Sequence, residues 1–148
     1  MNLMEYPRAT ALTLITCQGK LLLLRMREED IEYWAPPGGG LRQGETLPEA
    51  AAREAREEAG IDVSVGSLLY VHDFINPEDG CHKVEVYFRA VPVGDPAPRK
   101  TARQDARILE ARWFSMESVR HLPLFPPEFT EMLPVDLAEG AAPEVRYF

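Results

Sequence analysis

Three glutamates in one short stretch, Glu54, Glu57 and Glu58, have the spacing of neighbours on a helix. Residues three and four apart share a helical face, so three carboxylates would project from one patch. On a solvated helix such like charges repel by roughly a few tenths of a kcal/mol per pair. A hard divalent cation reverses this effect, because Mg²⁺ takes oxygen ligands. The pattern is therefore typical either of a magnesium site or of a solvated, charged helix face.

The helix that must carry these carboxylates has clear ends in the sequence. Thr46 is a good N-cap, Glu49 follows it by three residues, Pro48 suits the first turn and Gly60 is a C-cap. The interior is almost entirely Ala, Arg and Glu, which are strong helix formers. We therefore predict a helix from Thr46 to Ala59. Its opposite side carries small apolar residues that would pack closely on a sheet: Leu47, Ala51, Ala55 and Ala59.

Glycines just upstream of the helix change the balance between the two interpretations. The run 38–40 is Gly-Gly-Gly, and Glu45 follows five residues later. Glycine lets a backbone approach a metal ion or a phosphate closely. The combined spacing, Gly39-x₅-Glu45-x₇-Arg53-Glu54-x₂-Glu57-Glu58-x-Gly60, resembles the Nudix box, the signature of the Nudix hydrolase superfamily. Seven positions match in register, a coincidence on the order of one in a million by average residue usage.

The resemblance continues on both sides of the box. Residues 34–39 (WAPPGG) look like the family's approach to it, and residues 9–26 look like its opening hairpin, with a turn at Gln18–Gly19. Residues 110–114 look like the closing strand and the start of a helix. Ala55 is a mild departure, because the pattern asks for a bulkier aliphatic residue there.

The resemblance implies an α/β fold, the Nudix-type α/β/α sandwich with a mixed β-sheet. We expect a single domain over 1–148, with its core at about 9–134 and an irregular C-terminal tail. Local patterns agree with this expectation: they predict strands and short helices in alternation. Extended segments are predicted at 9–16, 20–26, 61–75, 82–91 and 107–114, and short helices after Ser115 and over 126–133.

The resemblance also implies an activity and a metal. Nudix proteins typically hydrolyse a nucleoside diphosphate linked to another moiety, X, with Mg²⁺ as the cofactor and Mn²⁺ as an alternative. Carried over by position, Glu57 and Glu58 would be the main metal ligands. Glu54 would be a further ligand or the base that activates water.

Further residues in and beside the box receive supporting roles from the resemblance. Arg53 would orient a neighbouring carboxylate, and the carbonyl of Gly38 or Gly39 would complete the metal coordination. Glu45 would be structural, bracing the loop by pairing with Arg53. Gly60 would be structural as well, as the end of the helix.

A general base outside the box has three candidates: Glu85, Asp105 and Glu110. Glu85 shares a predicted strand face with Tyr87 and Arg89, and that face either lines a pocket or is exposed to solvent. In relatives of this type a glutamate often stands just before the closing strand. This chain has Arg107 there, so Asp105 could substitute or Glu54 could do the work.

The substrate is less specified than the metal site. Pro77 follows the box at a distance that resembles the ADP-ribose-cleaving branch, which gives nucleotide sugars such as ADP-ribose a slight lead over (deoxy)nucleoside triphosphates. An alternative of another class is an inactive Nudix-fold protein that senses nucleotides, although all box carboxylates are present here. Aromatic residues are candidates either for stacking on a base or for the core: Tyr33, Trp34, Tyr70, Phe74 and Tyr87.

Composition narrows the partners. A formal net charge of −8 argues against long nucleic acid as a ligand, but permits a small nucleotide bound through a cation. We see no membrane-spanning run and no secretory signal in the first ten residues, and the two cysteines suit a reducing compartment, so we expect a cytoplasmic protein. The Leu/Phe/Pro-rich segment 122–134 could serve a homodimer.

Overall fold

Strands and short helices make up the computed structural model, which describes residues 6–148. Their order along the chain is β1 (Arg8–Cys17), β2 (Lys20–Glu28), β3 (Ile31–Ala35), β4 (Gly38–Gly40), α1 (Leu47–Ala59), β5 (Val63–Ile75), β6 (His82–Pro92), β7 (Ile108–Ser115), α2 (Met116–Val119), α3 (Phe129–Asp136) and β8 (Arg146–Tyr147). The predicted strands and helices are found in the predicted order, but β3, β4 and β8 lie in segments for which no strand was predicted. The second short helix lies three residues later than predicted, because Pro126 and Pro127 precede it instead of opening it.

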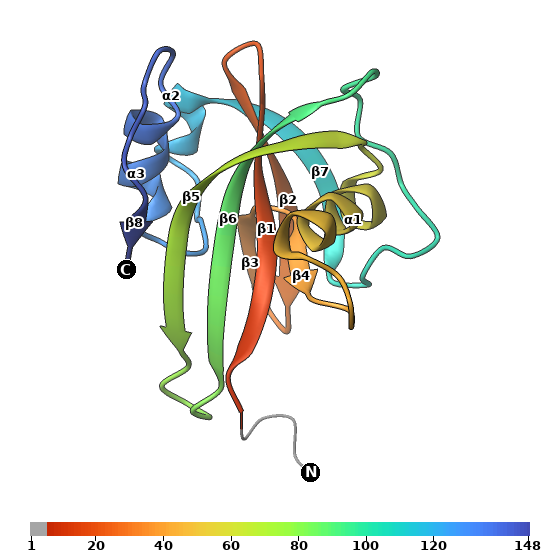
Figure 1. Ribbon diagram of the computed structural model, residues 1–148, viewed down its shortest axis with the longest axis vertical. Helices are drawn as coiled ribbons and strands as arrows, with labels where there is room; N and C mark the ends of the chain where they lie inside the picture. The colour runs from red at the N-terminus through yellow and green to blue at the C-terminus, as the bar shows by residue number, and fades with distance from the viewer. Residues whose placement is uncertain (1–5) are drawn as a thin grey trace.

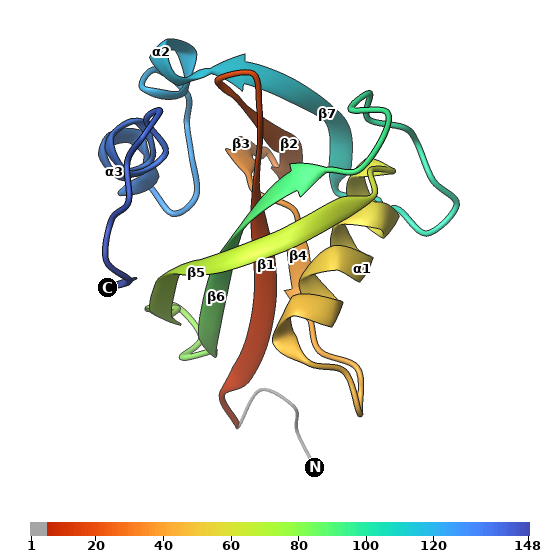
Figure 2. The same ribbon diagram turned by 45° about the horizontal axis from the view of Figure 1, so that its top comes forward.

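The strands form a mixed sheet in the order β3-β2-β1-β6-β5-β8, with β4 paired to β1 and β7 paired to β2. The β1–β6 and β5–β8 pairs are parallel and the remaining pairs are antiparallel. Helix α1 lies on one side of the strands, and α2 and α3 lie on the other (Figures 1 and 2). The predicted α/β/α sandwich with a mixed sheet is therefore confirmed.

The packing of α1 and β2 follows from their side chains. Leu21–Leu24 are all buried, as expected for a central strand covered on both faces. On α1, Ala51, Ala55 and Ala59 are fully buried against the sheet. Small side chains bring the helix axis close to the strands, which in turn places the glutamate face of α1 near β4.

Both ends of α1 are closed as the sequence predicts. The Thr46 hydroxyl accepts a hydrogen bond from the Glu49 amide at 3.3 Å. Gly60 ends the helix with φ +67°, a left-handed conformation that L side chains rarely adopt. A Cβ at Gly60 would also lie 2.5 Å from the Arg99 carbonyl oxygen, so the position is closed to other residues for two reasons.

The expected irregular tail is wrong in part. Helix α3 continues to Asp136, and β8 pairs in parallel with the middle of β5. Phe148 brackets the β5 backbone: its amide donates to the Val71 carbonyl at 3.0 Å, and its carbonyl accepts from the Asp73 amide at 2.7 Å. The missing backbone partners of an edge strand are the physical reason, since β5 would otherwise expose them.

Other expectations concern the surface and the ends of the chain. None of the helices described between residues 6 and 148 is both long and apolar enough to cross a membrane. Half of the segment searched for a secretory signal, residues 1–5, lies outside the described residues. Cys17 and Cys81 are free, half-buried thiols. Large apolar residues of segment 122–134 are buried within this chain's own core, so the composition of that segment has an intramolecular explanation: Leu124, Phe129 and Leu133.

Candidate active site

The glutamate face of α1 lies directly against the glycine strand β4. The Gly38 amide donates a hydrogen bond of 2.8 Å to Glu58 Oε1. A Cβ at Gly39 would lie 2.7 Å from Glu54 Oε1, closer than real Cβ contacts come. Two of the three predicted metal ligands thus touch the strand whose carbonyls are predicted to join them. Because glycine has no Cβ, the Glu54 carboxylate can lie directly against the strand at Gly39.

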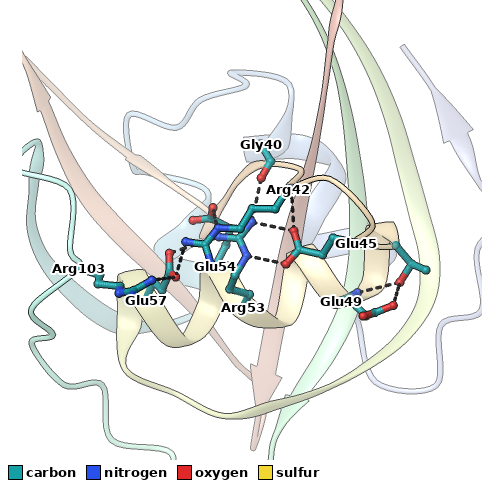
Figure 3. Close-up of polar contacts among 9 residues, drawn as sticks. Gly40, Arg42, Glu45, Glu49, Arg53, Glu54, Glu57 and Arg103 are labelled. Carbon is teal, nitrogen blue, oxygen red and sulfur yellow. Dashed lines mark hydrogen bonds and ion pairs between the residues drawn. The ribbon is translucent and has the colours of Figure 1, made fainter.

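Arg53 joins the loop, the strand and the helix (Figure 3). Its Nε and Nη2 donate to the two carboxylate oxygens of Glu45 at 2.6 and 3.0 Å, and Nη2 also donates to the Gly40 carbonyl at 2.9 Å. Its Nη1 donates to Glu54 at 2.8 Å and to Glu57 at 3.3 Å. The hydrogen bonds from Arg53 lower the pKa of Glu45 to about 2, and those from Glu45 raise the pKa of Arg53. The structure thus brings together the residues predicted to orient and brace the site.

Glu57 is surrounded by arginines. Besides Arg53, it meets Arg42 Nη2 at 3.0 Å and Arg103 Nη1 at 3.5 Å, both from loops on either side of α1 (Figure 3). Both guanidinium groups are more than half exposed, so solvent competes for these contacts. A carboxylate held by exposed arginines is free to exchange them for a bound cation.

Glu58 has a different environment. It is buried and, unlike Glu57, it has no arginine partner within residues 6–148. Burial and then the nearby charge of Glu54 raise its pKa, and the Gly38 amide opposes that shift only in part. A buried carboxylate beside a second carboxylate is costly to ionise unless a cation balances the charge.

A divalent cation fits this donor set. Within residues 6–148, no three acidic, histidine or cysteine side chains already converge at metal-binding distance, because the carboxylates turn towards arginines or the backbone. Yet the chain gathers three carboxylates and a glycine backbone at one place, and one of these carboxylates is buried without a counter-charge. Oxygen donors of this kind suit Mg²⁺ or Mn²⁺.

The three candidate bases lie in three different places. Glu85 is buried and lines a cavity together with Gly38–Gly40, so the solvent-facing alternative for Glu85 is wrong. Asp105 is held by Arg107, whose hydrogen bonds lower its pKa. Glu110 lies on β7, pairs with Arg25 and Arg112, and lines a separate cavity. Only Glu85 among the three lines the cavity at the glycine strand.

Two adjoining cavities form a groove beside the glycine strand. One, of about 220 Å³, is lined by Gly38–Gly40 and by three cationic side chains: Arg8, Lys83 and Arg107. The other, of about 310 Å³, has an aromatic wall of Tyr33, Phe74 and Phe125, with Asn76 and Asp79 at its polar side. Lys83 and Glu85 line both cavities, so the two cavities share part of their walls. We call this pair the substrate groove.

The aromatic candidates divide between groove and core. Tyr33 and Phe74 line the substrate groove, and Phe125 makes an edge contact with each of them at ring distances of 6.1 and 5.1 Å. The other three are buried core residues: Trp34, Tyr70 and Tyr87.

A larger cavity of about 640 Å³ lies elsewhere, between the β1–β2 turn and residues 137–140, and contains no predicted site residue.

The loop after β6 has a role that the sequence does not reveal. The Arg99 amide donates to the Ala59 carbonyl at 2.8 Å, and the Gln104 side chain donates to the Glu58 carbonyl at 2.8 Å. The Thr101 hydroxyl donates to the Glu57 carbonyl. These contacts satisfy the unpaired carbonyls at the end of α1 and hold its last turn in place. No local motif marks them, because each partner lies forty or more residues away in sequence.

The fold and site define a mixed-sheet α/β/α domain with an acidic helix against a glycine strand. The Nudix domain family model matches residues 5–134, and the chain belongs to the Nudix hydrolase family of enzymes. It is 32% identical to "Phosphatase NudJ" of Escherichia coli K12 over 113 residues. This aligned region covers 76% of this chain and 71% of that protein.

Solved structures agree with this assignment. A MutT Nudix hydrolase from Burkholderia pseudomallei is 31% identical, with a TM-score of 0.66 over 76% of this chain and 86% of that one. An ADP-ribose pyrophosphatase from Streptococcus suis is 20% identical, with a TM-score of 0.70 over 97% of this chain and 100% of that one. At that identity, the second comparison shows the shared fold alone.

Proposed function

We propose that this enzyme is a Mg²⁺-dependent hydrolase, with Mn²⁺ as a substitute, that cleaves the pyrophosphate bond of a nucleoside diphosphate linked to X. The observation that carries the proposal is the contact of Glu58 and Glu54 with the glycine strand. It gathers carboxylate and backbone oxygens at the mouth of a groove lined by cations and aromatic rings. An anionic, base-bearing substrate suits that lining.

The metal would be held by Glu54, Glu57, Glu58 and the carbonyl of Gly38 or Gly39. When bound, Mg²⁺ neutralises charge on the pyrophosphate oxygens and lowers the pKa of the water that attacks phosphorus. Arg53 keeps Glu54 and Glu57 in fixed rotamers through its hydrogen bonds, which reduces the reorganisation that catalysis would otherwise require.

The groove residues would bind the rest of the substrate. Arg8, Lys83 and Arg107 supply positive charge for phosphate oxygens, and Tyr33 and Phe74 supply flat surfaces for a base. Glu85 is our choice for the carboxylate that accepts a proton from the attacking water, because it faces the same cavity as the glycine strand.

For the group X, we propose nucleotide sugars such as ADP-ribose, with (deoxy)nucleoside triphosphates as the second candidate. Pro77 lies in the exposed turn 76–80, and two other residues of this turn, Asn76 and Asp79, line the groove. This position supports a role for the turn in selecting X. A small nucleotide substrate, a cytoplasmic location and a homodimer remain predictions that accompany the proposal.

A substrate panel tests the proposal. The protein is incubated with Mg²⁺ or Mn²⁺ and ADP-ribose, nucleoside tri- and diphosphates or other nucleotide sugars, and each product is measured. ADP-ribose would give AMP and ribose phosphate, whereas a triphosphate would give a monophosphate and pyrophosphate. Released inorganic phosphate is measured too, because one relative is named a phosphatase. Nucleotide binding without turnover of any compound would favour the sensor alternative and overturn the proposal.

A further inference from the structure

The aromatic ring of Phe148 stacks on the imidazole of His72, and His72 contacts Glu85, which lines the substrate groove. The ring centroids are 4.3 Å apart, with 20° between the planes. His72 Nδ1 lies 2.8 Å from Glu85 Oε1, and both side chains are buried. Phe148, His72 and Glu85 therefore form a continuous chain of contacts that ends in the groove.

The sheet register places this chain of contacts relative to the glycine strand. His72 on β5 lies opposite Glu85 on β6, Glu85 lies opposite Thr10 on β1, and Thr10 lies opposite Gly40 on β4. Directly opposed residues share one face of a sheet. Glu85 is thus two strands, or about 10 Å, from the glycine strand and on the face of the groove. A substrate that extends from the glycine strand to Glu85 would meet the Glu85 carboxylate, so the orientation of that carboxylate matters.

The segment 146–148 holds the Phe148 ring in register. The backbone of Phe148 pairs with Val71 and Asp73, the two neighbours of His72. Arg146 donates to the buried carboxylate of Asp136 at 2.8 Å, and Asp136 also accepts from the Tyr70 hydroxyl at 2.7 Å. The ring cannot slide along β5 without breaking these contacts, so it restricts the rotamer of His72.

We propose that Phe148 and His72 are positioning residues that fix the Glu85 carboxylate towards the substrate, an inference that rests on the proposed function. Glutamate has several rotatable bonds, and a freely rotating carboxylate would spend little time in a productive geometry. The His72 hydrogen bond removes that freedom, and Phe148 removes the freedom of His72. Phe148 acts without touching the metal site.

A double-mutant cycle on the full chain tests this proposal. Phe148→Leu keeps apolar volume but removes the flat ring, and Phe148→Tyr keeps the ring. Tyr147→Phe is the control in the same segment: it removes the contact of an exposed hydroxyl with Asp73 but leaves the Phe148 ring on His72. We expect Phe148→Leu to lower kcat on the order of tenfold with little change in KM. Phe148→Tyr and Tyr147→Phe should stay close to the parent protein. In a Glu85→Gln background, Phe148→Leu should have no further effect on kcat.

The ring signals of His72 in ¹H–¹⁵N NMR provide a readout without turnover. They should shift in Phe148→Leu and stay near the parent values in Tyr147→Phe. An unchanged His72 signal, an unchanged kcat, or an equal loss of kcat in the Glu85→Gln background would each overturn the proposal. A parent protein that hydrolyses no substrate, while the His72 signal still shifts in Phe148→Leu, would instead overturn the proposed function and leave the contact established.

Discussion

The amide of Gly38 donates a hydrogen bond of 2.8 Å to the carboxylate of Glu58, across 20 residues of sequence. This contact joins the glycine strand to the acidic helix with only a backbone group on one side. Both glycines of this strand face close neighbours: a Cβ at Gly38 would lie 2.2 Å from the Leu12 side chain on β1, and a Cβ at Gly39 would lie 2.7 Å from Glu54 Oε1 on the helix. The close approach therefore depends on the sequence of the strand as much as on that of the helix.

Gly39→Ala should impair activity more than stability. The added Cβ would lie 2.7 Å from Glu54 Oε1, which is the end of a side chain that can move, but Arg53 currently holds it. We expect kcat/KM to fall on the order of a hundredfold, with a small change in melting temperature. Gly66→Ala on β5 is the control, since its Cβ would meet the Arg89 carbonyl oxygen at an ordinary 3.4 Å. Equal activity of the two variants would contradict the importance of this contact.

Arg53→Lys should destabilise the fold although it keeps the charge. A lysine ammonium cannot reproduce the fork that contacts Glu45, Gly40 and Glu54 together. We expect a loss of about 1–3 kcal/mol in the free energy of unfolding, measured by urea denaturation. Arg56→Lys on the same helix, at a side chain 66% exposed, should cost less than about 0.5 kcal/mol. Similar values for the two variants would show that Arg53 is only a surface charge.

The contribution of Glu45 to stability should depend on pH in a defined window. Its folded-state pKa is about 2, below its ordinary value of 4.5, because Arg53 hydrogen-bonds to the charged form. The stabilisation is therefore complete above the ordinary value and is lost as the pH falls from 4.5 towards 2. The difference in unfolding free energy between the parent and Glu45→Gln should be larger at about pH 6 than at about pH 3. A difference that stays constant or grows in acid would argue against this pair.

The part of the site that the sequence predicts depends on interactions between residues close together in the chain. Thr46 and Gly60 act within one turn of the residues they cap, so the helix and its carboxylate face follow from neighbouring residues. The Nudix spacing then relates the helix to a glycine loop. The contact of the loop residue Glu45 with the helix was also predictable, because Glu45 belongs to the same motif.

Long-range pairings explain what the sequence does not predict. Residues 146–148 contain no strand signal of their own, and their structure depends on the unpaired edge of β5 and on Asp136. Gln104 and Thr101 reach the end of α1 from the segment between the predicted extended segments 82–91 and 107–114, where the sequence predicts no element. Glu85 shares a strand face with Tyr87, which is a core residue, so the sequence pattern does not reveal that Glu85 faces a cavity.

The choice of Glu85 as the proton acceptor predicts different effects for matched glutamine variants. Glu85→Gln keeps a hydrogen-bonding group beside His72 but removes the basic oxygen, so kcat should fall by about 100-fold or more. Glu110→Gln, which breaks partly exposed ion pairs with Arg25 and Arg112, should leave kcat close to the parent value. Steady-state kinetics on the best substrate compares them. Full activity in Glu85→Gln would return the role to Glu54 or Asp105.

The central claim is that the carboxylates at the glycine strand hold the metal on which hydrolysis depends. Its most direct measurement is the turnover of the best panel substrate as a function of Mg²⁺ concentration, for the parent, Glu58→Gln and Glu49→Gln. Glu49 is exposed in the first turn of the same helix, and glutamine can keep its contact with Thr46, so this variant controls for the helix itself. We predict that Glu58→Gln folds normally but loses activity by about 100-fold or more and needs more Mg²⁺, whereas Glu49→Gln matches the parent. A Glu58→Gln variant with the parent's activity and Mg²⁺ dependence would contradict the account.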